Sequence, residues 1–320
     1  MTEKKLKDQF MDKMKIKNYS DNTAKSYWAW CFKFIKYNNL QHPKDLTDKV
    51  NDYIAYLTIE RKLAPKTIRQ AAFGIIFLYN KVLQLDIPYI ELPKSHNRKI
   101  PVVLSREEVF TIIKNLPNNY RLIGKLMYAC GLRISEVAGL RINDIDFSNR
   151  QIIIRNSKGG KGRIIMMPNS LIADLELQIE KSKILYQQDF NNKFNGVTLP
   201  QTIKNKYPTI KFALDWQYIF PSYNLVENQR HHIHTSVIQK VIKSSIKKSK
   251  IYKIVSAHTF RHSFATHLLQ SGVDIRTVQD LLGHKSINTT MIYTHVLDNA
   301  KRIDFDLLEN NQIKIYRIAQ

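Results

Sequence analysis

The residues best suited to chemistry share one target, because together they could hold and attack a phosphodiester. In chain order they are Arg133, Lys158, His258, Arg261, His284 and Tyr293. The last four lie within a short C-terminal stretch, and Lys158 lies in a Lys-rich and Gly-rich turn at 157–163. This combination predicts cleavage of a phosphate ester, with the tyrosine hydroxyl as nucleophile.

Each residue type meets one requirement of that reaction. The transition state gathers charge on the non-bridging phosphate oxygens, and arginine offers a planar fork of donors for them. Tyrosine, with an ordinary pKa of about 10, needs orientation and a proton acceptor, and the leaving oxygen needs a general acid. The sequence contains neither a nucleotide-binding G-x-x-x-x-G-K-[ST] motif nor a run of acidic metal ligands. We therefore expect a reaction that uses neither a metal nor a cofactor.

Local sequence signals indicate how these residues are positioned. Ser256 is placed to begin a helix on which His258 and Arg261, three residues apart, share one face. Asp274 can begin the next helix, which is expected to end at Gly283, immediately before His284. A histidine just beyond a helix end can be aimed accurately at a substrate.

The rest of the chain is organised as two expected domains. Apolar residues at three- and four-residue spacing predict helices after Ser20, after Thr47 and from Pro65 to Val82. A basic segment bounded by prolines is expected to link this bundle to a second domain. In that domain, β-rich runs at 151–155 and 163–167 flank the Gly-rich turn and predict a hairpin. The expected boundaries are 1–92 for the helical domain, 93–102 for the linker and 103–320 for the mixed domain, with an insertion at about 187–229.

Composition narrows the class of partner. Lys and Arg number 50 against 27 Asp and Glu, which gives a net charge of +23, so nucleic acid is the expected partner. Cys31 and Cys130 lie in apolar helical patterns without metal-ligand spacing, and they are interpreted as buried free thiols. The sequence shows no secretory signal and no membrane-spanning apolar run, so a cytoplasmic location is expected.

Taken singly, these residues have simpler interpretations. A lone arginine such as Arg133 is more often part of a structural ion pair, and a lone histidine such as His258 is more often a core residue. Tyr293 alone would most often be a packed aromatic residue. His262, His267 and His295 are interpreted as core or surface histidines. It is the joint spacing that favours a catalytic site.

The combined pattern resembles the tyrosine recombinase family, and within it the integron integrases. The resemblance implies that Arg133 and Arg261 clamp the phosphate, and that Lys158 is the general acid. It implies that His258 assists proton transfer at Tyr293, that His284 bonds a non-bridging oxygen, and that Tyr293 forms a 3′-phosphotyrosine. Glu136 resembles a residue that steadies the arginine region. Lys161 and Arg163 compete with Lys158 for the acid role and are expected to contact phosphates instead.

The insertion resembles the segment that integron integrases add ahead of the His-x-x-Arg motif. The resemblance implies a folded single-strand hairpin as substrate, with unpaired bases that can stack on aromatic, histidine or proline side chains. The candidates for these contacts are Trp216, Tyr218, Pro221, His231 and His232. Alternatively, Trp216, Tyr218 and Phe220 alternate on a strand and simply pack. The stretch between Ser222 and Arg230 is shorter than the family pattern.

The expected fold is mainly α with a small β-sheet. It combines a SAM-like helical bundle with a mixed α/β catalytic domain in a C-shaped clamp on DNA. The expected function is site-specific recombination of gene cassettes by a tetramer assembled on two sites, with the tail at 297–320 available to pack on a neighbour. Two alternatives remain open: a chromosome-dimer-resolving or phage-type recombinase acting on duplex DNA, and a DNA-binding protein without catalysis.

Overall fold

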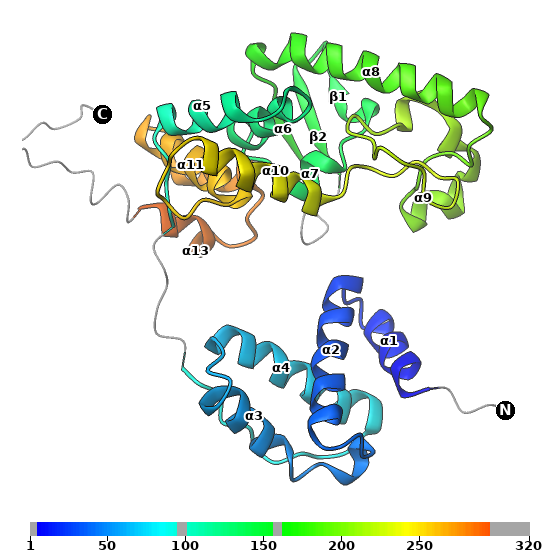
Figure 1. The fold of residues 1–320 in the computed structure, drawn as a ribbon, viewed down its shortest axis with the longest axis vertical. Coiled ribbons are helices and arrows are strands. Elements are labelled where there is room, and N and C mark those ends of the chain that lie inside the picture. Colours follow the sequence, from blue (N-terminus) through cyan, green and yellow to red (C-terminus); the bar gives the residue numbers. More distant parts are fainter. Residues whose placement is uncertain (1–4, 95–100, 156–161, 295–320) are drawn as a thin grey trace, which may run out of the picture. The chain divides into compact units, whose positions relative to one another are not determined.

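The computed structural model describes residues 5–94, 101–155 and 162–294. Within it the chain forms two compact units, residues 1–98 and 99–320 (Figure 1). The described part is mostly helical with one small sheet, which confirms the predicted fold class. Four parts of the sequence-based prediction lie outside the described residues: Lys158, Lys161, the centre of the linker and the C-terminal tail. None of the described helices combines the length and apolar character needed to cross a bilayer.

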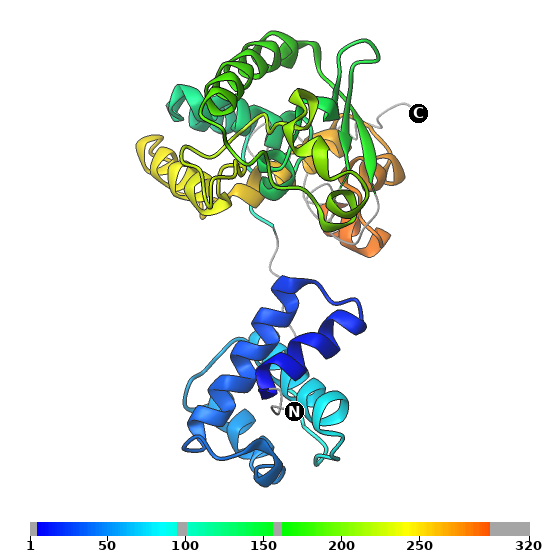
Figure 2. The same cartoon turned by 90° about the vertical axis from the view of Figure 1, so that its right-hand side faces the viewer.

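The first unit is built from amphipathic helices in its described residues (Figures 1 and 2). They are α1 (Leu6–Ile16), α2 (Asp21–Tyr37), the 3₁₀ turn η1 (Pro43–Asp45), α3 (Val50–Ile59), α4 (Pro65–Phe77) and the π-helical turn η2 (Leu78–Leu83). Helices α2 and α4 pack closely because Gly74 has no side chain. A Cβ there would lie 2.9 Å from the Tyr27 carbonyl oxygen. The Cys31 thiol, buried as predicted, donates to the Gly74 carbonyl at 3.2 Å.

The second unit surrounds a larger core with helices. They are α5 (Arg106–Asn115), α6 (Asn118–Ala129), α7 (Ile134–Ala138), α8 (Ile172–Asn191), α9 (Gln201–Lys206), α10 (Thr235–Lys248), α11 (Ala257–Gln270), α12 (Ile275–Leu282) and α13 (Ile287–Thr290). Helix α5 begins with a capping box in which Ser105 and Glu108 exchange hydrogen bonds, as the local sequence indicates. Apolar residues of α5, α6, α10 and α11 meet the sheet in one core.

The sheet of the second unit has three antiparallel strands in the order β1-β2-β3. They are β1 (Ile145–Asp146), β2 (Gln151–Ile154) and β3 (Arg163–Met166). Ile152 pairs with Ile165 and both are buried in the core. Strands β2 and β3 correspond to the two arms of the predicted hairpin, each one residue shorter than expected.

Short 3₁₀ turns connect these elements. They are η3 (Ile142–Asp144), η4 (Asn169–Leu171), η5 (Pro208–Phe212), η6 (Leu214–Trp216) and η7 (Met291–Tyr293). The stretch from Trp216 to Phe220 forms no strand. It contains the end of η6 and an isolated bridge between Tyr218 and Arg141, so the alternating pattern does not produce a strand here. Its three aromatic side chains are nevertheless buried, as the packing interpretation expects.

Candidate active site

Glu136 lies at the centre of a cluster of arginines. Its side chain is 2% exposed and accepts from Arg133 Nη1 at 2.6 Å. Arg163 donates to both carboxylate oxygens, at 2.9 and 2.8 Å. Burial alone would raise the pKa of Glu136, but the hydrogen bond and charge of Arg163, together with Arg133, outweigh it and lower that pKa to about 2. The carboxylate therefore stays ionised and anchors the guanidinium groups.

Arg261 completes the cluster from helix α11. Its side chain is 2% exposed, its Nη1 donates to the Gly131 carbonyl at 2.6 Å, and its Nη2 donates to the Leu282 carbonyl. Nη1 also lies 3.9 Å from Glu136. Burial and then the charge of Arg133 lower the pKa of Arg261 to about 9. Three guanidinium groups thus surround one carboxylate, and these four side chains carry an excess of positive charge suited to an anion.

Gly131 fixes where Arg261 is held. It follows helix α6 with a φ of +60°, a conformation that glycine adopts without strain. A Cβ at this position would lie 2.4 Å from the ring of Phe264. The end of α6 and the side of α11 can therefore approach closely, and the Gly131 carbonyl reaches the Arg261 guanidinium.

Tyr293 is buried beside this cluster at the end of η7, with 1% exposure. Its hydroxyl lies 2.9 Å from Nδ1 of His262. Its ring stacks on that of His284 with an interplanar angle of 15°. Burial raises the pKa of Tyr293, while the positive charges of Arg261 and then Arg133 act in the opposite direction. The phenol is therefore protonated at neutral pH and lies within the influence of two arginines.

His284 is positioned by the end of helix α12, as the sequence indicates. Asp274 caps the start of this helix, and Gly283 ends it in the left-handed conformation with a φ of +62°. The Nδ1 atom of His284 lies 3.0 Å from the Thr290 hydroxyl. Burial, followed by the charges of Arg261 and Arg133, lowers the pKa of His284 to about 4. At neutral pH the ring is uncharged, and its Nδ1 is already engaged by Thr290.

Helix α11 carries two further histidines toward the site. His258 is exposed in the first turn, and its ring lies edge-on to that of His262 with centroids 5.3 Å apart. His262 lies between His258 and Tyr293, with its ring 5.6 Å from that of the tyrosine. Burial, His258 and Arg261, in that order, lower the pKa of His262 to about 4.

The structure therefore brings together most of the residues singled out for catalysis. Arg133, Arg261, His284 and Tyr293 lie in one cluster, and His258 borders it through His262. The site also contains His262, which the sequence analysis interprets as a core or surface residue. Its spacing of four from His258 on a helix is a signal that it shares that face.

Arg163 occupies a different place from the one expected. We predicted a contact with phosphate, but its side chain is buried beneath the site. Its guanidinium donates to Glu136 and, through Nε, to the Leu281 carbonyl at 2.8 Å. It connects β3, α7 and α12. By binding Glu136, which also contacts Arg133 and Arg261, it helps to hold the carboxylate that anchors these two arginines.

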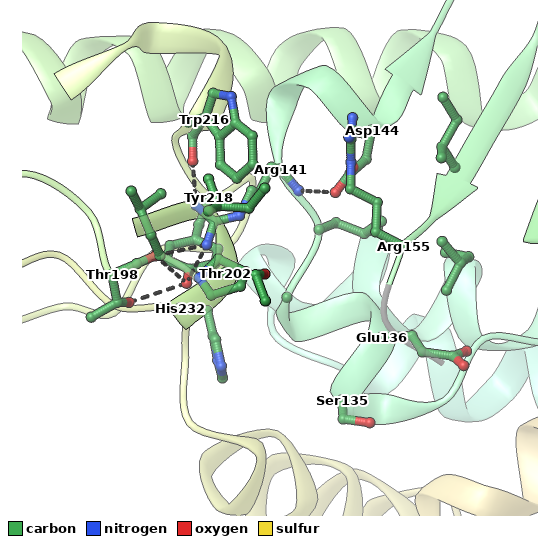
Figure 3. Close-up of a pocket in the computed structure, with 17 residues that line it drawn as sticks. Ser135, Glu136, Arg141, Asp144, Arg155, Thr198, Thr202, Trp216, Tyr218 and His232 are labelled. Atoms are coloured by element: carbon green, nitrogen blue, oxygen red, sulfur yellow. Dashed lines mark hydrogen bonds and ion pairs between the residues drawn. The ribbon is translucent and has the colours of Figure 1, made fainter. Parts of the chain in front are cut away.

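A cavity of about 470 Å³ lies between the inserted region and residues 135–155, and Glu136 of the arginine cluster also lines it (Figure 3). Arg141 is the buried residue that organises its wall. It donates to the carbonyls of Trp216 and Thr198 at 2.5 and 2.7 Å and to the Tyr218 hydroxyl at 2.8 Å. The guanidinium carbon lies 4.1 Å from the centroid of the Tyr218 ring. His232 also lines the cavity.

The five predicted base-stacking residues are thus divided between two kinds of position. Trp216 and Tyr218 are 8% and 6% exposed and pack with Arg141 in a small apolar cluster. Pro221 and His232 face each other across an isolated bridge and are partly exposed. His231 is also partly exposed, with Nδ1 3.3 Å from the Thr198 hydroxyl. The rings of Trp216 and Tyr218 form part of the cavity wall in this structure.

Comparisons with known proteins agree with this architecture. Residues 103–300 match the phage integrase family, and residues 6–89 match the N-terminal SAM-like domain of phage integrases. An integrase/recombinase of Escherichia coli is 38% identical over 303 residues, which cover 92% of this chain and 90% of that protein. The tyrosine recombinase XerA of Pyrococcus furiosus is 28% identical over 311 residues, covering 92% of each chain.

Solved structures show the same fold. XerH site-specific recombinase, in a post-cleavage complex with a palindromic difH substrate, superimposes with a TM-score of 0.64 at 19% identity, covering 95% of this chain and 85% of XerH. A lambda integrase fragment bound to a core site gives a TM-score of 0.62 at 16% identity, and the match covers 97% of this chain and 98% of the lambda integrase chain. The chain belongs to the phage integrase family and is a site-specific tyrosine recombinase.

Proposed function

We propose that this chain breaks and rejoins DNA strands through a 3′-phosphotyrosine intermediate formed by Tyr293. The observation that carries the proposal is the buried Tyr293 hydroxyl, which contacts an imidazole and lies close enough to Arg261 and Arg133 for their charges to oppose the rise in its pKa that burial causes. The tyrosine oxygen bonds to phosphorus as the P–O5′ bond breaks. The phenolic proton passes to a base, and the 5′ oxygen takes a proton from an acid.

The remaining predicted residues have matching proposed roles. Arg133 and Arg261 hold the non-bridging oxygens, because the arginine cluster has more positive charge than Glu136 can neutralise. His284 donates to one of these oxygens through its Nε2, since Nδ1 is engaged by Thr290. Lys158, outside the described residues, is proposed as the acid for the 5′ oxygen. Residues 1–92 are proposed to form a helical domain that also binds the DNA.

For the substrate, we propose folded single-strand sites of mobile gene cassettes, recombined by four protomers on two sites. The cavity of the inserted region supports this choice, because its volume lies in the range of roughly 300–1,000 Å³ typical of small-ligand pockets. Hydroxyls of Thr198 and Thr202 and the exposed Arg155 line it beside His232. These groups could hydrogen-bond the edge of an unpaired base.

Ordinary duplex sites are the second candidate. The buried positions of Trp216 and Tyr218 favour it, because rings already packed against Arg141 offer less surface for stacking. Under this alternative, the inserted region supports the fold and reads no unpaired base.

The central experiment measures covalent adducts on a denaturing gel. The wild-type chain is incubated with two radiolabelled pools of randomised DNA, one of nicked duplexes and one of hairpins with single unpaired bases. We expect a gel-stable adduct with wild type and none with Tyr293→Phe, which should still bind DNA. The matched control is Tyr223→Phe, because Tyr223 is 96% exposed. An adduct of normal yield with Tyr293→Phe would refute the proposal.

The two pools also separate the substrates. DNA recovered from the adduct is sequenced and resynthesised in hairpin and duplex form. For a hairpin substrate, His232→Ala should reduce the adduct with the hairpin and leave the duplex unaffected. Equal reduction of both, or adducts with duplex alone, would favour the second candidate.

A further inference from the structure

His262 is the imidazole in contact with the reacting oxygen. Its Nδ1 lies 2.9 Å from the Tyr293 hydroxyl, within the normal range for a hydrogen bond. The two residues come from different elements, α11 and η7, which pack together in the second unit. The contact therefore depends on the assembled site and is not a local feature of one helix.

Both groups of this hydrogen bond are uncharged at neutral pH, and the tautomer of His262 decides which of them donates. Burial raises the pKa of Tyr293, so the hydroxyl keeps its proton at neutral pH. Burial, His258 and Arg261 hold the pKa of His262 at about 4, so its ring is neutral. A neutral imidazole can accept at Nδ1 only when its proton is on Nε2. With that tautomer the Tyr293 hydroxyl donates to Nδ1 of His262, which is the arrangement that proton transfer to the ring requires.

His258, the residue expected to assist proton transfer, is one turn earlier on α11. It is exposed and contacts the edge of the His262 ring, with the centroids 5.3 Å apart. It is placed to affect the charge of His262, whereas His262 touches the reacting oxygen. We propose, on the basis of the proposed function, that His262 is the catalytic residue that accepts the Tyr293 proton during strand cleavage.

Cleavage and rejoining exchange the same bonds and protons in opposite directions. In cleavage, the Tyr293 oxygen bonds to phosphorus, the P–O5′ bond breaks, and the phenolic proton moves to Nδ1 of His262. The leaving 5′ oxygen takes its proton from the general acid of the proposed site. In rejoining, the 5′ hydroxyl returns its proton to the general acid as its oxygen attacks phosphorus, the phosphotyrosine bond breaks, and Nδ1 returns the other proton to Tyr293.

Substrate binding should strengthen this base. Among the causes that lower the pKa of His262 are the positive charges of His258 and Arg261. Arg133 and Glu136 lie beside Arg261, the ring of Tyr293 contacts that of His262, and the ring of His284 stacks on that of Tyr293. A phosphodiester held by the arginines brings a negative charge that offsets the positive ones. The base strength of His262 is therefore coupled to occupation of the site.

Two substitutions separate proton transfer from positioning. His262→Asn can place its side-chain oxygen close to the present position of Nδ1, so it retains a hydrogen-bond acceptor but cannot act as a base. His262→Ala removes both functions. The matched control is His267→Asn, because His267 lies on the same helix and makes the same kind of contact, with Nδ1 2.8 Å from the Tyr128 hydroxyl.

The readout is the single-turnover rate of adduct formation with the DNA that wild type selects from the randomised pools. A second form of this DNA carries a 5′-bridging sulfur at the cleaved phosphate, because a thiolate leaves without an acid. We expect His262→Asn and His262→Ala to lose about 10²-fold or more in rate, the usual range for a missing general base. The loss should persist with the sulfur substrate, and added imidazole should partly restore His262→Ala. His267→Asn should retain the wild-type rate.

Three results would overturn this role. The first is a normal rate in His262→Asn, which would show that a hydrogen-bond acceptor suffices, and the second is a normal rate in His262→Ala. The third is recovery of either variant on the sulfur substrate, which would show that His262 protonates the leaving 5′ oxygen instead. If His262→Ala does not fold, His262→Asn decides alone. Absence of an adduct with wild type would overturn the proposed function as well, so the two failures are distinct.

Discussion

Replacing Glu136 with glutamine tests the central electrostatic argument. The pKa of this carboxyl is lowered from 4.5 to about 2 by its arginine partners, against the effect of burial. At about 1.4 kcal/mol per pKa unit, this corresponds to roughly 3 kcal/mol of stabilisation at neutral pH. A similar cost, about 3–5 kcal/mol, is typical when one partner of a buried ion pair is removed. For a domain of this size, the expected drop in melting temperature is roughly 6–12 °C.

The pH dependence gives the sign of the effect. A carboxyl with a lowered folded-state pKa contributes its full stabilisation above its unfolded-state pKa and loses it as the pH falls. The difference in unfolding free energy between wild type and Glu136→Gln should therefore be constant above about pH 5. It should shrink as the pH falls from 4.5 toward 2, where Glu136 itself takes up a proton.

Calorimetry of the full chain measures both quantities through the transition of the second unit. The control is Glu180→Gln, because Glu180 pairs with Lys183 on the exposed surface and such pairs contribute about 0–1 kcal/mol. Sulfate should restore Glu136→Gln more than wild type, since the variant leaves three guanidinium groups without a carboxylate. A shift no larger than that of Glu180→Gln, or a difference that does not change below pH 5, would refute the reasoning.

Two further substitutions test how the structure around the site is held. Gly131→Ala should destabilise the chain by about 1–3 kcal/mol more than Gly272→Ala. Both glycines have a positive φ, but of the two only Gly131 lacks room for a Cβ. Equal melting temperatures of the two variants would contradict this. Asp189→Asn should cost about 3–5 kcal/mol, because it leaves Arg230 buried without its carboxylate. It should also speed proteolysis of the inserted region, whereas Asp174→Asn, at a half-exposed pair, should leave the cleavage rate unchanged.

The helix boundaries around the site could be predicted because each depends on nearby residues. Asp274 and Gly283 lie at the predicted ends of α12, and Ser105 caps the start of α5. Caps and left-handed glycines act within one turn of the chain, so a short window of sequence contains the relevant physics. The same holds for β2 and β3, whose apolar runs flank the Gly-rich turn.

The contacts between elements could not be predicted in the same way. Arg163 reaches Glu136 only because β3 passes beside α7, and His262 reaches Tyr293 only because η7 packs on α11. At the cavity, Arg141 precedes Tyr218 of the inserted region by 77 residues yet fixes its hydroxyl. A polar residue can choose among many partners, and the choice is made by tertiary packing, which spacing alone does not encode.

The charge balance of the cluster supports the proposed role of the buried Tyr293 phenol as a nucleophile. Burial makes Tyr293 harder to ionise, and Arg261 and Arg133 oppose that effect. Concentrating guanidinium groups without counterions would destabilise the fold, so Glu136 neutralises part of their charge. Complete neutralisation would leave nothing to attract a phosphate. One carboxylate among three arginines is a compromise between these demands, because the remaining charge is matched only when an anionic substrate occupies the site. Binding of the DNA phosphate should therefore stabilise the folded second unit.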